Sequence, residues 1–299
     1  MPKRVVLALG GNALLDPEKP QTWQNMERKI RNTVQHVVSL IHQDVELIIT
    51  HGNGPQVGDA LLKDYAVENE LRYPLYVHDA ETQAQIGLLL QNTIQEIAPK
   101  VKIATVLTRI LVDRKDPAFQ HPSKPVGPEY IKKPNIGGSI EEIEPGRYRQ
   151  VVASPMPRKI LDIGTIKVLL RENIIPIACG GGGIPVIKEN GQIKGIDAVI
   201  DKDFASALLA KEIDADILLI ATDVPGIAKN YGKENQTWIK EIQSTELRRM
   251  LNTFPEGSMK PKAQAAIDFV ESTGKVAIIC ALEDIDKAIS GDRGTIVRK

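Results

Sequence analysis

The sequence predicts an α/β protein built on a mainly parallel sheet that helices cover on both faces. Short, almost wholly apolar runs such as Val5–Leu9 and Leu47–Thr50 are typical of strands buried on both faces. Between them lie longer segments whose apolar residues recur every three or four positions, which is the period of a helix packed along one side. Strands that alternate with helices in this way are typical of βαβ units, in which the strands lie parallel.

The N-terminal part of the chain follows this alternation closely. After the first strand, Met26, Ile30, Val34 and Ile41 lie at helical spacing and predict a helix. The elements expected next are a strand at 47–50, helices near 55–67 and 81–97, and a strand at 103–107.

The middle of the chain, from Asp113 to Pro157, has a different composition. It contains eight prolines and several glycines, and it shows no sustained helical pattern. A segment of this length inside a compact domain is typical of a lid or a binding excursion, although a purely structural insertion is the alternative.

The alternation resumes in the C-terminal part. The expected elements are a helix at 162–172, a strand at 174–179, a hairpin that turns at 189–191, a helix at about 202–211, a strand at 216–221, a helix at 260–272, and strands at 276–280 and 295–298.

The composition restricts the class of function. The 299 residues fit one large domain or two lobes, at roughly 100–200 residues per domain. Lys plus Arg and Asp plus Glu both number 38, so no basic excess is available to neutralise a nucleic acid or an anionic membrane. Aromatic residues make up only 4%, which disfavours a surface that stacks bases. Any anion-binding site is therefore expected to be local.

Neither the N-terminus nor the cysteines point to secretion. Only five apolar residues precede the first glycine turn, and no apolar run reaches the ~18 residues of a membrane span. Cys179 and Cys280 each end an apolar run, so we interpret them as buried thiols and not as disulfide or zinc ligands. The expectation is a cytoplasmic protein without a nucleic-acid or membrane partner.

Glycine turns follow three of the predicted strands. They are Gly10-Gly11-Asn12, Gly52-Asn53-Gly54 and the run from Gly180 to Gly183. In an open parallel sheet such turns gather at the carboxyl ends of the strands, where ligands bind, and glycine lets a phosphate approach the backbone. Tight turns alone would explain any one of them. Neither the P-loop pattern nor the dinucleotide G-x-G-x-x-G pattern is present.

Three lysines are candidates for contact with phosphate. Lys202 lies between Asp201 and Asp203, where a helix is expected to begin, and a cation there opposes the helix dipole unless an anion lies beside it. The alternative is a surface lysine paired with one of its aspartates. Lys262 follows a glycine turn and, taken alone, is interpreted as a solvated side chain, and Lys124 lies in the proline-rich excursion.

Other catalytic signals are weak. His51, beside the second glycine turn, is either a base or a hydrogen-bonded structural histidine. No His-x-x-x-His pair or carboxylate cluster predicts a metal cage, and no G-x-S-x-G elbow predicts a serine hydrolase.

Seven segments together carry a resemblance to a known family. They are Ala8–Ala13, Thr50–Gly58, Asp116–Phe119, Lys124–Pro128, Cys179–Val186, Gly195–Ala205 and Gly257–Met259. In this order they resemble the amino-acid kinase superfamily and, within it, the carbamate kinases. The first turn is common to the superfamily, whereas Gly-Asn-Gly-Pro-Gln-Val-Gly, Lys-Pro-Val-Gly-Pro and Val-Ile-Asp-Lys-Asp are far more specific. The resemblance extends over essentially the whole chain.

The resemblance implies a fold, a reaction and partners. The fold is a three-layer αβα sandwich with a mainly parallel open sheet and a small protruding lid. A single amino-acid kinase-like domain at 1–299 would contain a carbamate-binding lobe over about 1–174, its lid over about 113–157, and a nucleotide-binding lobe over about 175–299. The reaction is ATP + carbamate = ADP + carbamoyl phosphate, with Mg²⁺ on the nucleotide, in a homodimer.

The matching motifs also imply roles for individual residues. The lysines at the transferring phosphoryl group would be Lys124, Lys202 and Lys262, with Asp203 to orient them. The first turn, Gly10, Gly11 and Asn12, would hold phosphates, and the second, Gly52, Asn53 and Gly54, would hold carbamate. The nucleotide-binding set would be Gly181, Gly182, Thr222, Asp223, Val224, Tyr231 and Met259. No residue is expected to be a dedicated metal ligand.

This chemistry agrees with the residues themselves. Carbamate is already an anion, so its attacking oxygen needs no general base. The difficulty is to bring one anion against another, and lysines and backbone N–H groups provide the positioning and charge that phosphoryl transfer requires.

Two segments depart from the family pattern. Around 145–150 the lid is several residues shorter, and segment 79–87 lacks a usual glycine after Thr82-Gln83 and has Glu81 at a usually apolar position. These changes bear on lid closure, substrate choice and dimer packing. Two other hypotheses are a related kinase for another small carboxylate, such as an acylated amino acid, and a non-catalytic nucleotide-binding regulator.

Overall fold

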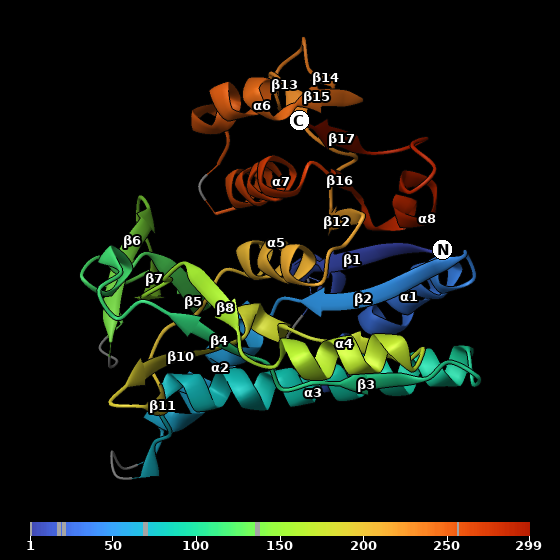
Figure 1. Ribbon diagram of the computed structural model, residues 1–299. Coiled ribbons are helices and arrows are strands. Elements are labelled where there is room, and N and C mark those ends of the chain that lie inside the picture. Colours follow the sequence, from blue (N-terminus) through green and yellow to red (C-terminus); the bar gives the residue numbers. More distant parts are fainter. Residues whose placement is uncertain (1, 17–18, 20–21, 68–70, 135–137, 256) are drawn as a thin grey trace.

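A computed structural model of the chain describes residues 2–16, 19, 22–67, 71–134, 138–255 and 257–299 (Figure 1). The strands are β1 Lys3–Leu9, β2 Val45–His51, β3 Ile103–Thr105, β4 Arg109–Val112, β5 Lys124–Tyr130, β6 Ser139–Glu144, β7 Arg147–Val152, β8 Pro157–Ile160, β9 Ile175–Ile177, β10 Ile184–Glu189, β11 Gln192–Gly195, β12 Ile217–Thr222, β13 Ala228–Lys229, β14 Thr237–Trp238, β15 Glu241–Gln243, β16 Val276–Ala281 and β17 Thr295–Arg298. The helices are α1 Trp23–Ile41, α2 Gly54–Tyr65, α3 Leu75–Ile97, α4 Ile163–Arg171, α5 Lys202–Glu212, α6 Ser244–Met250, α7 Met259–Thr273 and α8 Ile285–Ala288.

An eight-stranded sheet forms the centre of the molecule. Its strand order is β15-β17-β16-β12-β1-β2-β9-β3. Every neighbouring pair is parallel except β16 and β17. The prediction of a mainly parallel sheet is therefore confirmed.

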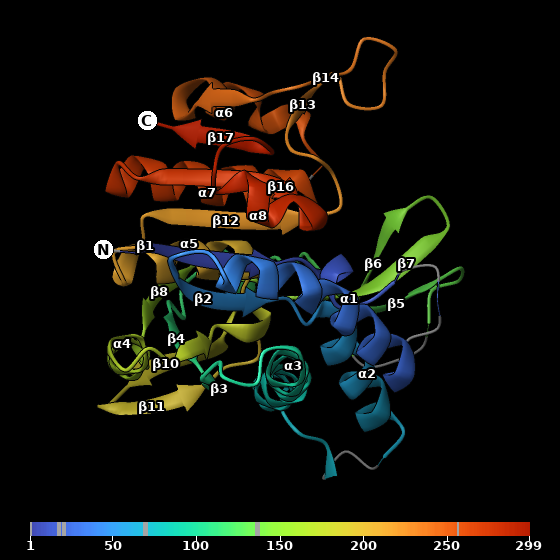
Figure 2. The same ribbon diagram turned by 90° about the vertical axis from the view of Figure 1, so that its right-hand side faces the viewer.

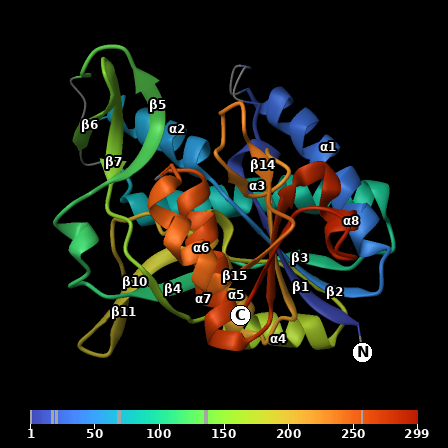
Figure 3. The same ribbon diagram turned by 90° about the horizontal axis from the view of Figure 1, so that it is seen from above.

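The two faces of this sheet are covered by different helices. In β1, Val6 and Ala8 point into one apolar cluster, which also holds side chains of α4, α5 and α7. Val5 and Leu7 point into the opposite cluster, with α1, α3 and α8. Figure 3 shows the two helix layers on either side of the strands. The result is the expected three-layer αβα sandwich.

Residues of the proline-rich excursion form a small sheet of their own. Strands β5, β7 and β6 pair antiparallel in that order. Figures 1 and 2 show this sheet, which we call the lid, protruding from the main body near α2. In Figure 1 it lies beyond the carboxyl ends of β1 and β2. The prediction of a small protruding lid is confirmed.

Some elements differ from the sequence prediction. Helix α3 starts at Leu75 and not at Glu81, because polar residues such as Asp79 occupy its buried face and hide the apolar period. A second, four-stranded sheet in the order β11-β10-β4-β8 was also not predicted, although the hairpin of β10 and β11 was.

Two predictions from the apolar runs can be compared with the structure. Cys179 and Cys280 are buried free thiols. Within the described ranges, none of the helices combines the length and the apolar character that a bilayer crossing requires.

Candidate active site

The turns after β1, β2 and β12 meet at the carboxyl edge of the central sheet. Leu9, the last residue of β1, is in register with His51 on one side and with Ala221 on the other. The Gly52 amide donates to the Leu9 carbonyl at 3.2 Å, and a Cβ built on Gly52 would lie 3.7 Å from the Gly11 nitrogen. The two predicted substrate turns are therefore in direct contact.

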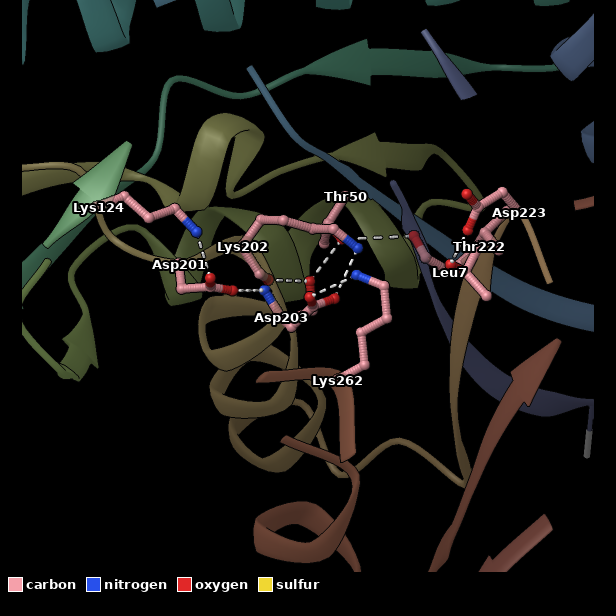
Figure 4. A network of polar contacts seen from close by, with 10 residues as sticks. Leu7, Thr50, Lys124, Asp201, Lys202, Asp203, Thr222, Asp223 and Lys262 are labelled. Atoms are coloured by element: carbon pink, nitrogen blue, oxygen red, sulfur yellow. Dashed lines mark hydrogen bonds and ion pairs between the residues drawn. The ribbon is translucent and has the colours of Figure 1, made fainter. Parts of the chain in front are cut away.

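Two of the three candidate lysines converge on one buried carboxylate. Lys202 Nζ lies 2.6 Å from Asp203 Oδ1, and Lys262 Nζ lies 3.1 Å from Asp203 Oδ2. The Asp203 side chain is only 3% exposed. Lys202 and Asp203 belong to the first turn of α5, and Lys262 belongs to the first turn of α7. Figure 4 shows the two ammonium groups side by side.

The charges of this cluster are mutually stabilised. Burial raises the pKa of Asp203, but the two lysines outweigh it and hold the pKa well below its ordinary value. Burial lowers the pKa of Lys202, and the positive charge of the neighbouring Lys262 lowers it further. The attraction of Asp203 raises this pKa but does not outweigh the burial. Burial also lowers the pKa of Lys262, but the attraction of Asp203 outweighs burial, so the pKa of Lys262 is raised. One carboxylate thus serves two cations, which leaves positive charge for an anionic ligand.

The third lysine comes from the lid. Lys124, at the start of β5, forms an ion pair with Asp201, and Asp201 caps α5 by accepting from the Asp203 amide at 2.9 Å. The lid rests on α2 through a backbone contact, since a Cβ added to Gly58 would lie 2.0 Å from Gly127 Cα. The segment 201–203 therefore links all three lysines.

One cavity adjoins this cluster, and a second cavity adjoins the first. One, of about 360 Å³, is lined by Gly10, Gly11, Asn12, Lys262, Thr222 and Asp223 among others. The other, of about 640 Å³, is lined by Thr222, Asp223, Val224, Tyr231 and Met259 among others. Because they share Thr222 and Asp223, they form one route toward the lysines. Asn12 Nδ2 donates to Asp223 Oδ2 at 3.0 Å, which ties the first glycine turn to this shared wall.

The sequence was compared with known proteins. It matches the model of the Amino acid kinase family over residues 3–281. The chain belongs to the amino acid kinase family.

Within this family the chain groups with the carbamate kinases. It is 43% identical to carbamate kinase of Pyrococcus horikoshii over 312 residues, which cover 99% of each chain. It is 42% identical to carbamate kinase of Trichomonas vaginalis over 308 residues, which cover 98% of each chain. The solved structure of Giardia lamblia carbamate kinase bound to AMP-PNP superposes with a TM-score of 0.91 at 36% identity, covering 100% of this chain and 99% of that one.

A more distant solved structure shares the fold. UMP kinase of Bacillus anthracis is 16% identical, with a TM-score of 0.56, and covers 100% of this chain and 97% of its own.

In this carbamate kinase-like chain, two residues of the predicted nucleotide-binding set lie outside both cavities. Gly181 and Gly182 do not line either cavity. Their strand, β9, lies on the far side of β2 from β1 and β12, so the turn that follows it lies beside the second glycine turn. A Cβ on Gly181 would lie 2.2 Å from Asn53 Nδ2, and one on Gly182 would lie 2.0 Å from the Ile200 carbonyl oxygen. The run therefore supports the predicted carbamate turn.

The structure also places residues that the sequence analysis left open or missed. His51 is 1% exposed, and its Nδ1 lies 2.9 Å from the Gly52 carbonyl oxygen, which favours the structural interpretation. Asp79 and Thr82 of α3 bind the Asn53 amide and were not singled out. The available signal was that polar residues occupy positions at helical spacing on the buried face of α3.

Proposed function

We propose that this chain transfers a phosphoryl group reversibly between ATP and carbamate, giving ADP and carbamoyl phosphate. The observation that carries the proposal is the Asp203 carboxylate bound by both Lys202 and Lys262, with Lys124 paired to the adjacent Asp201. Cations fixed in this way offset the repulsion between an anionic acceptor and the phosphates before the reaction begins.

The proposed roles follow the two sides of the lysine cluster. On one side, Gly52, Asn53 and Gly54 hold carbamate. On the other, Gly10, Gly11 and Asn12 hold phosphates, and Thr222, Asp223, Val224, Tyr231 and Met259 surround the nucleoside. Lys124, Lys202 and Lys262 contact the transferring group, and Asp203 orients the last two. The acceptor oxygen is anionic, so no residue has to remove a proton from it.

Magnesium fits this arrangement as a companion of the nucleotide. Mg²⁺ is commonly bound by phosphate oxygens, waters and one or two carboxylates. Asp223 and Glu283 line the cavity beside the first glycine turn and would hold such an ion, whose charge would offset that of the phosphates. Among the residues with described coordinates, no group of three or more His, Cys, Asp or Glu side chains could form a cage of its own.

The resemblance also supports a lobe assignment and an assembly. We propose that the acceptor binds to the lobe at about 1–174 and the nucleotide to the lobe at about 175–299. We also propose a homodimer, which light scattering on the purified protein would measure as twice the chain mass of 32.9 kDa.

The proposal is tested by mixing the protein with MgADP and carbamoyl phosphate and measuring ATP. We expect Lys202→Ala to lower turnover by at least about 10²–10³-fold, because it removes a preorganised charge, and to keep the folded circular dichroism spectrum. Lys211→Ala, at the exposed end of the same helix, is the matched control and should retain wild-type turnover.

Each contrary outcome has a distinct meaning. Near-wild-type turnover by Lys202→Ala would overturn the assignment of the site. ADP binding without ATP formation would favour a regulator, and ATP formation only from another acyl phosphate would favour a different acceptor.

A further inference from the structure

Two side chains of α3 hold the Asn53 amide in the predicted acceptor turn. Asn53 Nδ2 lies 3.3 Å from Asp79 Oδ1 and 2.9 Å from Thr82 Oγ1. All three residues are buried, with exposed fractions of 2%, 1% and 2% for Asn53, Asp79 and Thr82. Gly181 packs on the same amide and limits its movement on that side.

The Thr82 hydroxyl determines which way the amide points. Its single proton is directed to the carbonyl oxygens of His78, at 2.8 Å, and Asp79, at 3.0 Å. Its oxygen therefore acts as an acceptor toward Asn53, so the amide nitrogen faces α3. Both hydrogens on Nδ2 then have acceptors. In the described part of the chain, no donor is hydrogen-bonded to Asn53 Oδ1.

Asp79 is suited to this role as a neutral acid. Burial raises the pKa of its carboxyl well above the usual range, the Asn53 bond opposes the rise, and Asp197 adds to it. On the same helix, His78 lies between two carboxylates, with Glu81 at 2.7 Å from its Nδ1 and Asp64 at 2.8 Å from its Nε2. A protonated carboxyl accepts from Asn53 through Oδ1, and its buried Oδ2, which has no hydrogen-bond partner among the described residues, carries the proton at lower cost than a charge.

We infer that Asp79, together with Thr82, is a positioning residue that turns Asn53 Oδ1 toward the acceptor, where it accepts an N–H from the acceptor's amino group. The inference rests on the proposed function and deepens it. Carbamate carries an amino group beside its carboxylate, whereas acetate has a methyl group in the same place. Asn53 held in this orientation therefore selects carbamoyl phosphate over an acyl phosphate of the same size.

The test compares kcat/KM for carbamoyl phosphate and acetyl phosphate, each with MgADP. Asp79→Leu and Thr82→Val each remove one acceptor from Asn53, so its amide can turn. We expect the carbamoyl-to-acetyl ratio to fall by about five- to tenfold in either variant, because one neutral hydrogen bond is lost. The KM for ADP should stay near its wild-type value, since the nucleotide cavities are lined by other elements.

Two further variants separate positioning from structure. Asp79→Asn keeps an acceptor oxygen at the same place and should recover most of the ratio lost in Asp79→Leu. Thr93→Val changes another buried threonine of α3, far from Asn53 in the helix, and should leave the ratio unchanged. If Asp79→Leu fails to fold, Thr82→Val gives the answer.

The outcomes distinguish this inference from the proposed function. A wild-type protein that makes no ATP from carbamoyl phosphate would overturn both. An active wild type whose ratio is the same in Asp79→Leu and Thr82→Val would overturn the role of Asp79 alone. An equal loss of ratio in Thr93→Val would show a general effect of α3 and would also overturn it.

Discussion

Lys202 and Lys262 belong to the core of the molecule, whereas Lys124 comes from the lid. The side chains of the first two are 11% and 13% exposed. Both bind Asp203, whose side chain is 3% exposed. Lys124 is 32% exposed and pairs with Asp201 at the start of α5. The packing of α5 and α7 on the sheet therefore positions Lys202 and Lys262, which we call the core pair. The position of Lys124 depends instead on the position of the lid. Loss of the core pair and loss of lid placement should consequently have different signatures.

Asp203→Asn should have the largest effect. It removes the carboxylate that binds both buried ammonium groups, so we expect turnover to fall by about 10²–10³-fold and the free energy of unfolding to fall by about 3–5 kcal/mol. ATP formation and urea unfolding measure the two effects.

Asp201→Asn is the matched control, because asparagine also caps helices and only the more exposed pair with Lys124 is lost. The free energy of unfolding of this variant should change by less than about 1 kcal/mol. Equal destabilisation by both substitutions would contradict the distinction between core and lid.

Gly58→Ala tests the placement of the lid. Its Cβ would lie 2.0 Å from Gly127 Cα, so α2 and β5 must separate and carry Lys124 with them. We expect turnover to fall by between about 10- and 100-fold, with less destabilisation than in Asp203→Asn. Gly164→Ala, in helix α4, is the control: its Cβ would meet nothing within 4 Å, and it should gain up to about 1 kcal/mol of stability at full turnover. An active Gly58→Ala protein would show that the lid contact does not position Lys124.

At neutral pH His51 gives the smallest effect, because its contribution is visible only in the pH dependence of stability. Burial lowers its pKa to about 4, with Lys202 adding to the shift and the Gly52 bond opposing it. The unfolded chain, with a histidine pKa of about 6.5, binds the proton first, so stability is full above about pH 6.5 and decreases as the pH falls toward 4. The shift corresponds to about 3 kcal/mol in urea unfolding between pH 7.5 and 4. His51→Asn keeps a donor for Gly52 and should remove this component, and an unchanged pH slope in the variant would exclude His51 as its source.

Local patterns in the sequence predicted most of the sheet and singled out Lys202, whereas Lys262 was assigned only through the family resemblance. The apolar runs of β1, β2 and β12 and the helical spacing in α1 depend only on burial and period, so they are visible without tertiary information. The sequence also indicated that Lys202, next to Asp203, needs a partner, because a lysine at a helix start is electrostatically unfavourable without one.

The remaining features depend on contacts between distant segments. The pairing of Lys124 with Asp201 requires the lid to fold back over α5, and no local pattern records that contact. Gly181 was assigned to the nucleotide through the family resemblance, whereas in the folded chain it packs against the Asn53 amide. Asp79 was overlooked because a buried carboxyl on a helix looks like a surface residue until its partner is known.

The left-handed glycine run has a consequence for directed evolution. Gly181, Gly182 and Gly183 have φ values of +65°, +99° and +89°, and a Cβ at any position from 180 to 183 would lie within 2.6 Å of another atom. Saturation mutagenesis of these four codons should therefore return almost only the parental residue. Libraries meant to change acceptor preference should leave the run intact and vary residues of α3, two of whose side chains bind the Asn53 amide.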